Sequence, residues 1–219
     1  MSKKQALVIG LGQFGMALAR ALTHEGFEVL AIDVDRARVQ EAATFAAHAA
    51  ALDATDEDAL SGLNPESRDL AVCAIGHEAR ESTILVTTLL RQLGARRVVS
   101  RATDPLIARI LHLVGADLVV NPEKEYGERF ARRLAYAGIR DEIELAPNLV
   151  ISELEVRPVM KGKSLAALAL PDRFGLTVLA IKNGDDDLER PDPHRPLATG
   201  DVLLVAGRPG AAQTLVEEW

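Results

Sequence analysis

The sequence predicts an α/β fold: a doubly wound parallel sheet of six strands, then one more helix and a small α+β domain. Three observations predict it. Aliphatic runs recur six times with amphipathic helical segments between them, a glycine-rich turn follows the first run, and the pattern changes after Asn121-Pro122. The 219 residues are 48% hydrophobic but only 4% aromatic, so the core is aliphatic. Such a core suits parallel strands that are buried on both faces.

The expected elements of the first domain follow in chain order. Glycines stand where three of the helices should end, at Gly26, Gly94 and Gly115, as C-terminal glycines do. The first crossover should be right-handed, and ligand contacts should gather at the carboxyl ends of the strands. The strands are predicted at residues 6–9, 29–33, 48–53, 70–76, 97–101 and 117–121, and the helices at 14–25, 36–46, 57–63, 80–93 and 105–114.

The second part of the chain reads differently. A helix over residues 123–136 ends at Gly138, and residues 138–147 are the expected joint. We place the first domain, with this helix, at residues 1–137 and the α+β domain at 138–219. The latter should contain strands 150–156, 176–182 and 202–206, helices 164–168 and 211–218, a polar turn at 183–187 and a proline-rich stretch at 190–196.

The glycine run is the most informative motif. Gly10 allows a tight turn after the first strand, Gly12 lets the backbone approach phosphates, and Gly15 lets the next helix pack closely on that strand. Asp33, at the end of the second strand, can accept hydrogen bonds from ribose hydroxyls. This strand, turn, helix, strand and acid predict a Rossmann-like nucleotide site; the alternative is a glycine-rich turn in an empty domain of that type.

Three further strand ends are candidates for ligand contact. The run Asp53-Ala54-Thr55 could contact the base, or Thr55 could cap the next helix, and the two roles are compatible. Gly76 would let the backbone approach the ribose or base. Arg101 ends the fifth strand and is a plausible phosphate partner; its alternative role is a surface ion pair with Asp104.

Other reactive residues suggest no chemistry. His77 lacks an identifiable orienting partner, and Cys73 lies in an apolar strand without a basic neighbour to lower its pKa. The five histidines do not pair at metal-ligand spacing, and Asp185-Asp186-Asp187 lacks the other ligands of a calcium loop, which favours a solvated turn.

Composition narrows the function classes. A net charge of −7 argues against a general nucleic-acid-binding surface. A single cysteine excludes an internal disulfide and fits a reducing cytoplasm. No signal peptide fits the N-terminus, and no apolar run reaches membrane-spanning length, so we expect a soluble chain.

Taken together, these motifs resemble the cytoplasmic regulator-of-potassium-conductance (RCK) subunits of bacterial potassium uptake systems of the Ktr and Trk type. The glycine run alone is unspecific, but the combination with Gly115-Ala116-Asp117 and Asn121-Pro122-Glu123-Lys124 is much more specific. The resemblance spans nearly the whole chain; its other motifs are Ala31-Ile32-Asp33-Val34-Asp35, Gly162-Lys163-Ser164-Leu165, Arg173-Phe174-Gly175 and Gly200-Asp201-Val202-Leu203.

The resemblance implies a regulator that does no chemistry. Such subunits form dimers that assemble into octameric rings beneath a potassium-translocating membrane partner of the KtrB or TrkH type. ATP, ADP or, in Trk-type members, NAD(H) binds at Gly10, Gly12, Gln13, Phe14, Gly15, Asp33 and the neighbouring strand ends. Exchange of nucleotide changes the ring and the conductance. The chain would then be cytoplasmic and peripheral to the membrane through its partner.

Three details also come from the resemblance. The helix that begins near Glu123 crosses onto the partner subunit, and Glu123 matches an acid near a cation, divalent or Na⁺, that bridges phosphates at the dimer interface. The C-terminal domain resembles one that binds cyclic di-AMP in some relatives, without a convincing match of residues. Many Ktr-type subunits carry arginine at the position of Gln13, and glutamine donates only neutral hydrogen bonds, roughly half as strong as charge-assisted ones. Gln13 therefore weakens the expected discrimination of ATP from ADP, and NAD(H) remains a candidate ligand. Arg101 could partly compensate for the missing arginine.

Two other functions compete with the gating subunit. A nicotinamide-dependent oxidoreductase would share the nucleotide site but needs a general acid or base beside a substrate cavity. The C-terminal domain offers His194 and few other candidates. A nucleotide-sensing domain that serves a different partner is the third hypothesis.

Overall fold

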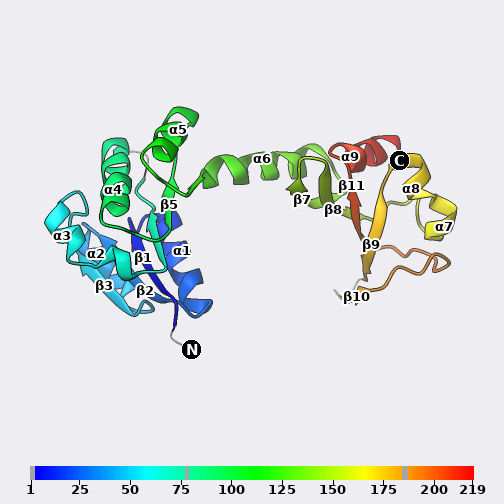
Figure 1. The fold of residues 1–219 in the computed structure, drawn as a ribbon. Coiled ribbons are helices and arrows are strands. Elements are labelled where there is room, and N and C mark those ends of the chain that lie inside the picture. Colours follow the sequence, from blue (N-terminus) through cyan, green and yellow to red (C-terminus); the bar gives the residue numbers. More distant parts are fainter. Residues whose placement is uncertain (1–2, 77–78, 184–186) are drawn as a thin grey trace. The chain divides into compact units, whose positions relative to one another are not determined.

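The computed structural model of the chain describes residues 3–76, 79–183 and 187–219. The chain forms two compact units, Met1–Glu123 and Lys124–Trp219 (Figure 1). The change of unit falls at the start of the long helix α6 (Pro122–Ala135). The division into functional domains at residues 137 and 138, which counted this helix with the first domain, stays a prediction.

The first unit contains the predicted doubly wound parallel sheet. Among the described residues it has six strands in the order β3-β2-β1-β4-β5-β6, and every neighbouring pair is parallel. The order reverses between β1 and β4, which creates a crevice at the carboxyl ends of those strands. The strands are β1 (Gln5–Ile9), β2 (Glu28–Asp33), β3 (His48–Ala51), β4 (Leu70–Cys73), β5 (Val98–Arg101) and β6 (Leu118–Val120).

Helices cover both faces of this sheet because the central strands are apolar on both. On β1, Leu7 and Ile9 pack in one buried cluster with side chains of α3 and α4. Ala6 and Val8, which point the other way, pack with α1 and α2. The helices of this unit are α1 (Gln13–His24), α2 (Arg36–Ala42), α3 (Glu57–Ser61), the 3-10 turn η1 (Pro65–Ser67), α4 (Arg80–Gln92) and α5 (Pro105–Leu113).

Three helices begin at aspartates that follow strands. Asp35 accepts from the Ala37 N–H at 2.8 Å, Asp56 from the Ala59 N–H at 3.1 Å, and Asp104 from the Ile107 N–H at 2.9 Å. The bond from Ile107, and then the charge of Arg80, hold the pKa of Asp104 below its usual value. Each cap satisfies a helix N–H group that would otherwise lack a partner.

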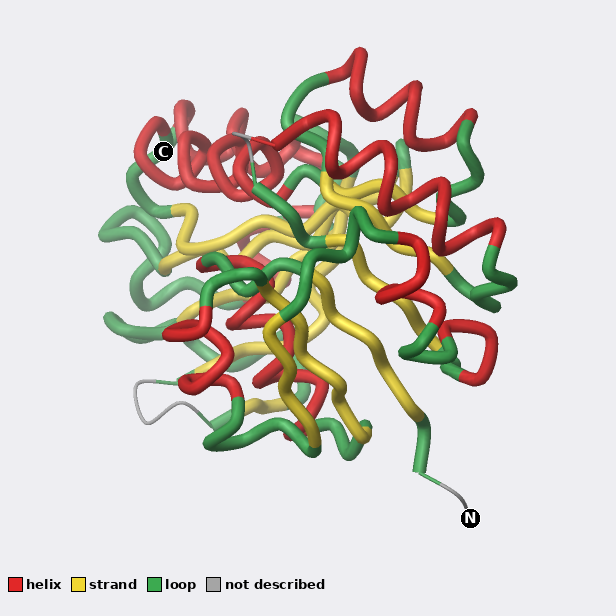
Figure 2. Tube along the Cα trace, turned by 90° about the vertical axis from the view of Figure 1, so that its left-hand side faces the viewer, coloured by secondary structure: helices red, strands yellow, loops and turns green. Residues whose placement is uncertain are grey.

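The second unit is the predicted small α+β domain, and its sheet is antiparallel and contains two strands that were not predicted, β7 and β10. The strand order among the described residues is β10-β9-β11-β8-β7. The elements that follow α6 are β7 (Ile139–Ala146), β8 (Leu149–Glu155), α7 (Leu165–Leu168), α8 (Leu170–Phe174), β9 (Thr177–Lys182), β10 (Leu188–Glu189), β11 (Val202–Gly207) and α9 (Ala211–Glu218). Figure 2 colours the helices of the chain red and its strands yellow along the Cα trace.

The expectation that residues 138–147 form a joint is wrong, because β7 occupies most of this segment and pairs with β8. Its sequence reads as polar, yet Glu142 is buried inside the unit. Its carboxylate accepts hydrogen bonds from Ser152 Oγ at 3.3 Å and Gln213 Nε2 at 2.8 Å, and Arg132 Nε lies 3.4 Å away. These partners satisfy a buried carboxylate that the strand pattern could not reveal.

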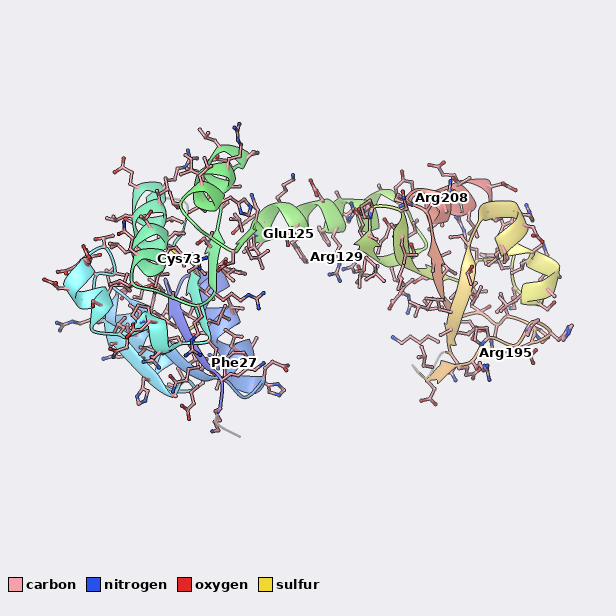
Figure 3. The ribbon with its side chains drawn as sticks, viewed as in Figure 1. Phe27, Cys73, Glu125, Arg129, Arg195 and Arg208 are labelled. Carbon is pink, nitrogen blue, oxygen red and sulfur yellow. The ribbon has the colours of Figure 1, made fainter. Side chains whose placement is uncertain are left out.

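Helix α6 has no buried side chain. Tyr126 and Phe130 stack on its surface with ring centroids 5.8 Å apart, and Leu134 is 72% exposed. Two hydrogen bonds from Arg129 to Asp141 tie the helix to β7, one of them 2.7 Å from Nε to Oδ1 (Arg129 is labelled in Figure 3). This helix is therefore held by polar contacts rather than by a hydrophobic face.

The C-terminus of the second unit is anchored by aromatic packing. The ring of Trp219 meets that of Phe174 edge-on at 5.1 Å, and the Arg173 guanidinium lies 4.5 Å from the Trp219 ring centroid. Phe174 ends α8, a helix that was not predicted. It follows α7 after Ala169, whose φ of 47° breaks the helical run, and its early Pro171 suits a first turn.

Candidate functional site

A cleft of about 780 Å³ opens at the carboxyl ends of the strands in the first unit. It lies where the strand order reverses, the usual ligand position in such sheets. All of the predicted contact residues line it except Gly15. The residues that line it are Ile9, Gly10, Gly12, Gln13, Phe14, Ile32, Asp33, Val34, Arg38, Leu52, Asp53, Ala54, Thr55, Ala74, Ile75, Gly76, Ala79, Ser82, Arg101 and Glu123.

The three glycines of the loop have three different roles. Gly10 has a φ of +92°, and a Cβ there would come within 2.8 Å of the Ile75 nitrogen. A Cβ on Gly15 would lie 1.8 Å from the Gly10 carbonyl oxygen, so Gly15 serves the packing of α1 on β1 and lies outside the cleft. A Cβ on Gly12 would have no atom within 4 Å. Gly12 thus keeps open the space that a ligand's phosphates would fill.

The N-terminus of α1 faces the same cleft. Gly12 is its N-cap and supplies no side-chain cap, and Gln13, the first residue of the helix, is exposed. Backbone N–H groups in the first turn, with the helix dipole behind them, attract an anion. This end of the cleft is therefore suited to phosphate.

Asp33 is buried at the end of β2 and has a double role. Its Oδ2 accepts from the Leu11 N–H at 2.6 Å, and its Oδ1 accepts from the Asp35 N–H at 2.8 Å. Each carboxylate oxygen can accept a further hydrogen bond. The carboxylate thus fixes the glycine loop and can still accept ribose hydroxyls.

Arg38 is a cleft residue that the sequence did not suggest. It stands in the first turn of α2, with Nη1 3.6 Å from Asp33 Oδ2 and Nε 3.6 Å from Asp35 Oδ2. The sequence does contain a signal for this contact, because Arg38 follows Asp33 by five residues. That spacing places Arg38 in the first turn of α2, which faces back toward Asp33. Arg38 adds a cation to the Asp33 end of the cleft.

After β3, the side chain of Asp53 stabilises a turn of the chain. Its Oδ1 accepts from both the N–H and the Oγ1 hydroxyl of Thr55, at 2.9 and 2.7 Å. These bonds, the hydroxyl first, hold the pKa of Asp53 below its usual value. Ala54 is buried and lines the cleft. The helix cap expected at Thr55 is made by Asp56 instead.

Arg101 ends β5, and β1 and β4 separate this strand from β2, which ends at Asp33. The Arg101 side chain is only 13% exposed, and its Nη2 donates to Oε1 of Glu123. The guanidinium carbon is 5.8 Å from the centre of the Phe14 ring, and Nη1 lies beside Gly76. The alternative ion pair with Asp104 is wrong, since Asp104 pairs with Arg80 at 3.3 Å.

No described cleft residue is a histidine, lysine, tyrosine or cysteine. The predicted loop residue His77 lies outside the described residues, as do Asp185 and Asp186 of the acidic turn. Burial raises the pKa of the Cys73 thiol to about 11, so it is inert as a nucleophile (Figure 3). Within the described ranges, no three His, Cys, Asp or Glu side chains gather as a metal site. No helix of those ranges combines the length and apolar character needed to cross a membrane.

Comparison with known families matches both parts of the chain. Residues 6–122 match the TrkA-N domain and residues 150–218 match the TrkA-C domain. Ktr system potassium uptake protein A of Vibrio alginolyticus is 35% identical over 204 residues, which is 93% of this chain and 92% of that protein. Ktr system potassium uptake protein C of Bacillus subtilis (strain 168) is 33% identical over 205 residues, 94% of this chain and 92% of the relative.

Solved structures share the fold. The GsuK RCK domain superposes with a TM-score of 0.69 at 18% identity, covering 99% of this chain and 47% of that one. A GsuK channel bound to NAD superposes with a TM-score of 0.68 at 17% identity, covering 98% of this chain and 39% of that one. This chain thus spans less than half the length of those solved chains.

Proposed function

Because the chain belongs to the TrkA family of potassium uptake proteins, with the Ktr system proteins among its relatives, we propose that it is a nucleotide-sensing subunit that gates potassium flux. The resemblance to RCK subunits drawn from the sequence is thereby confirmed. These two relatives are potassium uptake proteins. The acids among the described cleft residues are Asp33, Asp53 and Glu123, which bind the Leu11 N–H, Thr55 and Arg101 respectively, and this favours a binding site over an oxidoreductase.

The fit of the cleft to an adenine nucleotide is the observation that carries the proposal. The space beside Gly12 and the uncapped start of α1 would receive phosphates, and the free acceptor capacity of Asp33 would receive ribose hydroxyls. Val34 and Ala54 offer apolar surface beside Asp33, where the base would lie. ATP, ADP and NAD(H) share these groups, and the NAD-bound GsuK structure of the same fold favours keeping the dinucleotide among the candidates.

The proposed partner is a membrane subunit that translocates potassium. The chain would act at the inner face of the membrane through that partner, as dimers that build a ring. The exposed aromatic and leucine side chains of α6 support a partner surface on that helix. When a cation is bound at the dimer interface, Glu123 is the candidate residue to contact it.

Gating requires two conformations that bind the ligands with different affinity. A nucleotide that binds both equally shifts nothing, however tightly it binds. The proposal therefore includes at least two nucleotides, or a bound and a free state, that favour different forms of the ring.

Calorimetric titration of the purified chain with ATP, ADP, NAD and NADH tests the nucleotide site. At least one should bind with micromolar or better affinity, and the ligand that binds should change the potassium flux of membranes containing a Ktr-type translocating subunit. An absence of binding by all four would refute the sensor. Binding without any effect on flux would favour a sensing domain that serves a different partner.

A further inference from the structure

The ion pair between Arg101 and Glu123 suggests how the site selects its ligand. Resting on the proposed nucleotide site, we propose that Glu123 is an internal competitor of the ligand's phosphate for Arg101. The carboxylate and a phosphate both bind guanidinium through paired oxygens. Glu123 therefore acts as a specificity-determining residue: only a ligand with a phosphate that can take over Arg101 overcomes the competition.

The sheet itself brings the two residues together. Arg101 ends β5, and its register partner in the neighbouring parallel strand β6 is Val120. Three residues beyond Val120, in the first turn of α6, the chain brings Glu123 beside the Arg101 guanidinium. The contact thus follows from strand pairing, and both side chains line the cleft.

The environments of the two partners are unequal. Arg101 is 13% exposed and Glu123 is 60% exposed. Within the described part of the chain, the buried Nε of Arg101 has no hydrogen-bond acceptor. A guanidinium that is largely desolvated, with one donor unused, gains from an additional anion, whereas an exposed glutamate loses little on release to water.

Charge in the cleft points in the same direction. Arg38 and Arg101 are its only described cationic lining residues, and Arg38 already lies beside Asp33 and Asp35. Arg101 is therefore the cation left for phosphate, since Gln13 at the start of α1 carries no charge. The Arg101 guanidinium cannot stay paired with Glu123 and at the same time give its full charge to the phosphate of the ligand.

The competition has a consequence for α6. The helix is continuous from Pro122 to Ala135, so the residue that a phosphate displaces is part of the helix that begins the second unit. Binding of phosphate at Arg101 thereby loosens the first turn of α6 from β5. Adenosine, which lacks phosphate, leaves this contact in place.

The test is calorimetric titration of the full chain with adenosine, ADP and ATP in buffer containing EDTA, so that no divalent cation joins the site. Glu123→Gln should bind ADP and ATP roughly threefold to tenfold more tightly than the wild type, the effect of one released ion pair. Its adenosine affinity should not change. Glu128→Gln is the matched control, because it removes the same charge from an exposed position on the same helix outside the cleft.

A double-mutant cycle isolates the pair. With Arg101→Gln already present, Glu123→Gln should give no further gain for ADP. Hydrogen exchange of the second turn of α6, whose N–H groups bond back to the carbonyls of the first turn, should become faster when ADP binds the wild type. Thermal melting shows whether each variant is folded. If Arg101→Gln does not fold, the single variant and the exchange measurement still decide.

Three results would overturn the competition. One is weaker ADP binding by Glu123→Gln, which would make Glu123 a binding residue; another is an equal gain for adenosine or in Glu128→Gln. The third is an ADP affinity that is the same in the wild type and in Glu123→Gln. That result refutes the competition but does not contradict the proposed nucleotide site. If no protein binds any of the three compounds, the competition is refuted, and the proposed function fails as well when NAD and NADH also do not bind.

Discussion

Asp33 Oδ2 accepts a hydrogen bond from the backbone N–H of Leu11 at 2.6 Å, which joins the end of β2 to the glycine loop. One buried carboxylate therefore both supports the loop and faces the cleft. A substitution at this residue changes stability and ligand binding together, and the two effects need separate measurement.

Asp33→Ala should lower the free energy of unfolding by about 1–3 kcal/mol, because the Leu11 and Asp35 N–H groups lose a charged acceptor. It should also weaken adenosine binding about tenfold or more through the lost ribose contact. Urea unfolding and calorimetry measure the two effects. Asp35→Ala is the control: it removes the α2 cap, worth about 1 kcal/mol, but should leave adenosine affinity unchanged. Unaltered affinity in Asp33→Ala would remove Asp33 from the site.

Substitutions of Gly15 and Gly12 by alanine should separate packing from ligand binding. The new Cβ of Gly15→Ala would lie 1.8 Å from the Gly10 carbonyl oxygen, so we expect a loss of more than about 3 kcal/mol of stability or failure to fold. Gly12→Ala meets no atom within 4 Å and has an ordinary φ of −65°, so its stability should stay within about 1 kcal/mol of the wild type. Its Cβ projects into the phosphate space and should weaken ADP binding about tenfold. Full ADP affinity in Gly12→Ala would contradict the predicted phosphate position.

Gln13→Arg should improve ATP binding more than adenosine binding. Gln13 is the exposed first residue of α1, and a guanidinium there would replace neutral hydrogen bonds by charge-assisted ones about twice as strong. We expect a gain of roughly tenfold for ATP and little change for adenosine, measured by calorimetry. Gln92→Arg, exposed at the end of α4 and outside the cleft, adds the same charge. An equal gain in that control would mean that long-range attraction, and not a direct contact, causes the effect.

The Arg129–Asp141 pair should make stability depend on pH. The hydrogen bond from Arg129 holds the pKa of Asp141 below its usual value. The stabilisation is therefore complete above the unfolded-state pKa of about 3.9 and is lost as the pH falls through the lower folded-state pKa. Asp141→Asn should cost about 1 kcal/mol at pH 7, given the partial exposure of the pair, and progressively less below pH 4.

Urea unfolding of both proteins across this pH range measures the effect. Glu144→Gln, a change to an exposed carboxylate on the same strand, serves as the comparison and should cost less at neutral pH. A cost for Asp141→Asn that is constant with pH would show that the ion pair does not stabilise the fold.

Much of the first unit could be predicted because its local signals agree. The aliphatic run of β1, the loop glycines and Asp33 specify strand, turn, helix and strand in the positions observed. The parallel sheet follows from the repeated alternation of strand and helix. The cleft could be anticipated for the same reason, since strand ends gather at one edge of such a sheet.

Two of the misses depend on contacts between residues that are distant in the sequence. The sequence of β7 resembles a polar linker, because the partners of its buried Glu142 include Arg132 and Gln213, which lie elsewhere in the chain. The pairing of Arg101 with Glu123 requires the β5–β6 register, which sequence spacing alone does not specify. Arg38 faces Asp33 only because α2 begins immediately after β2.

The anchored C-terminus has a spectroscopic consequence. The chain's single tryptophan, Trp219, and its two tyrosines, Tyr126 and Tyr136, all belong to the second unit, while the cleft belongs to the first. Intrinsic fluorescence therefore observes only the second unit. A change in emission when nucleotide is added would report a rearrangement of that unit or of its assembly, and the wild-type chain carries this probe without any label.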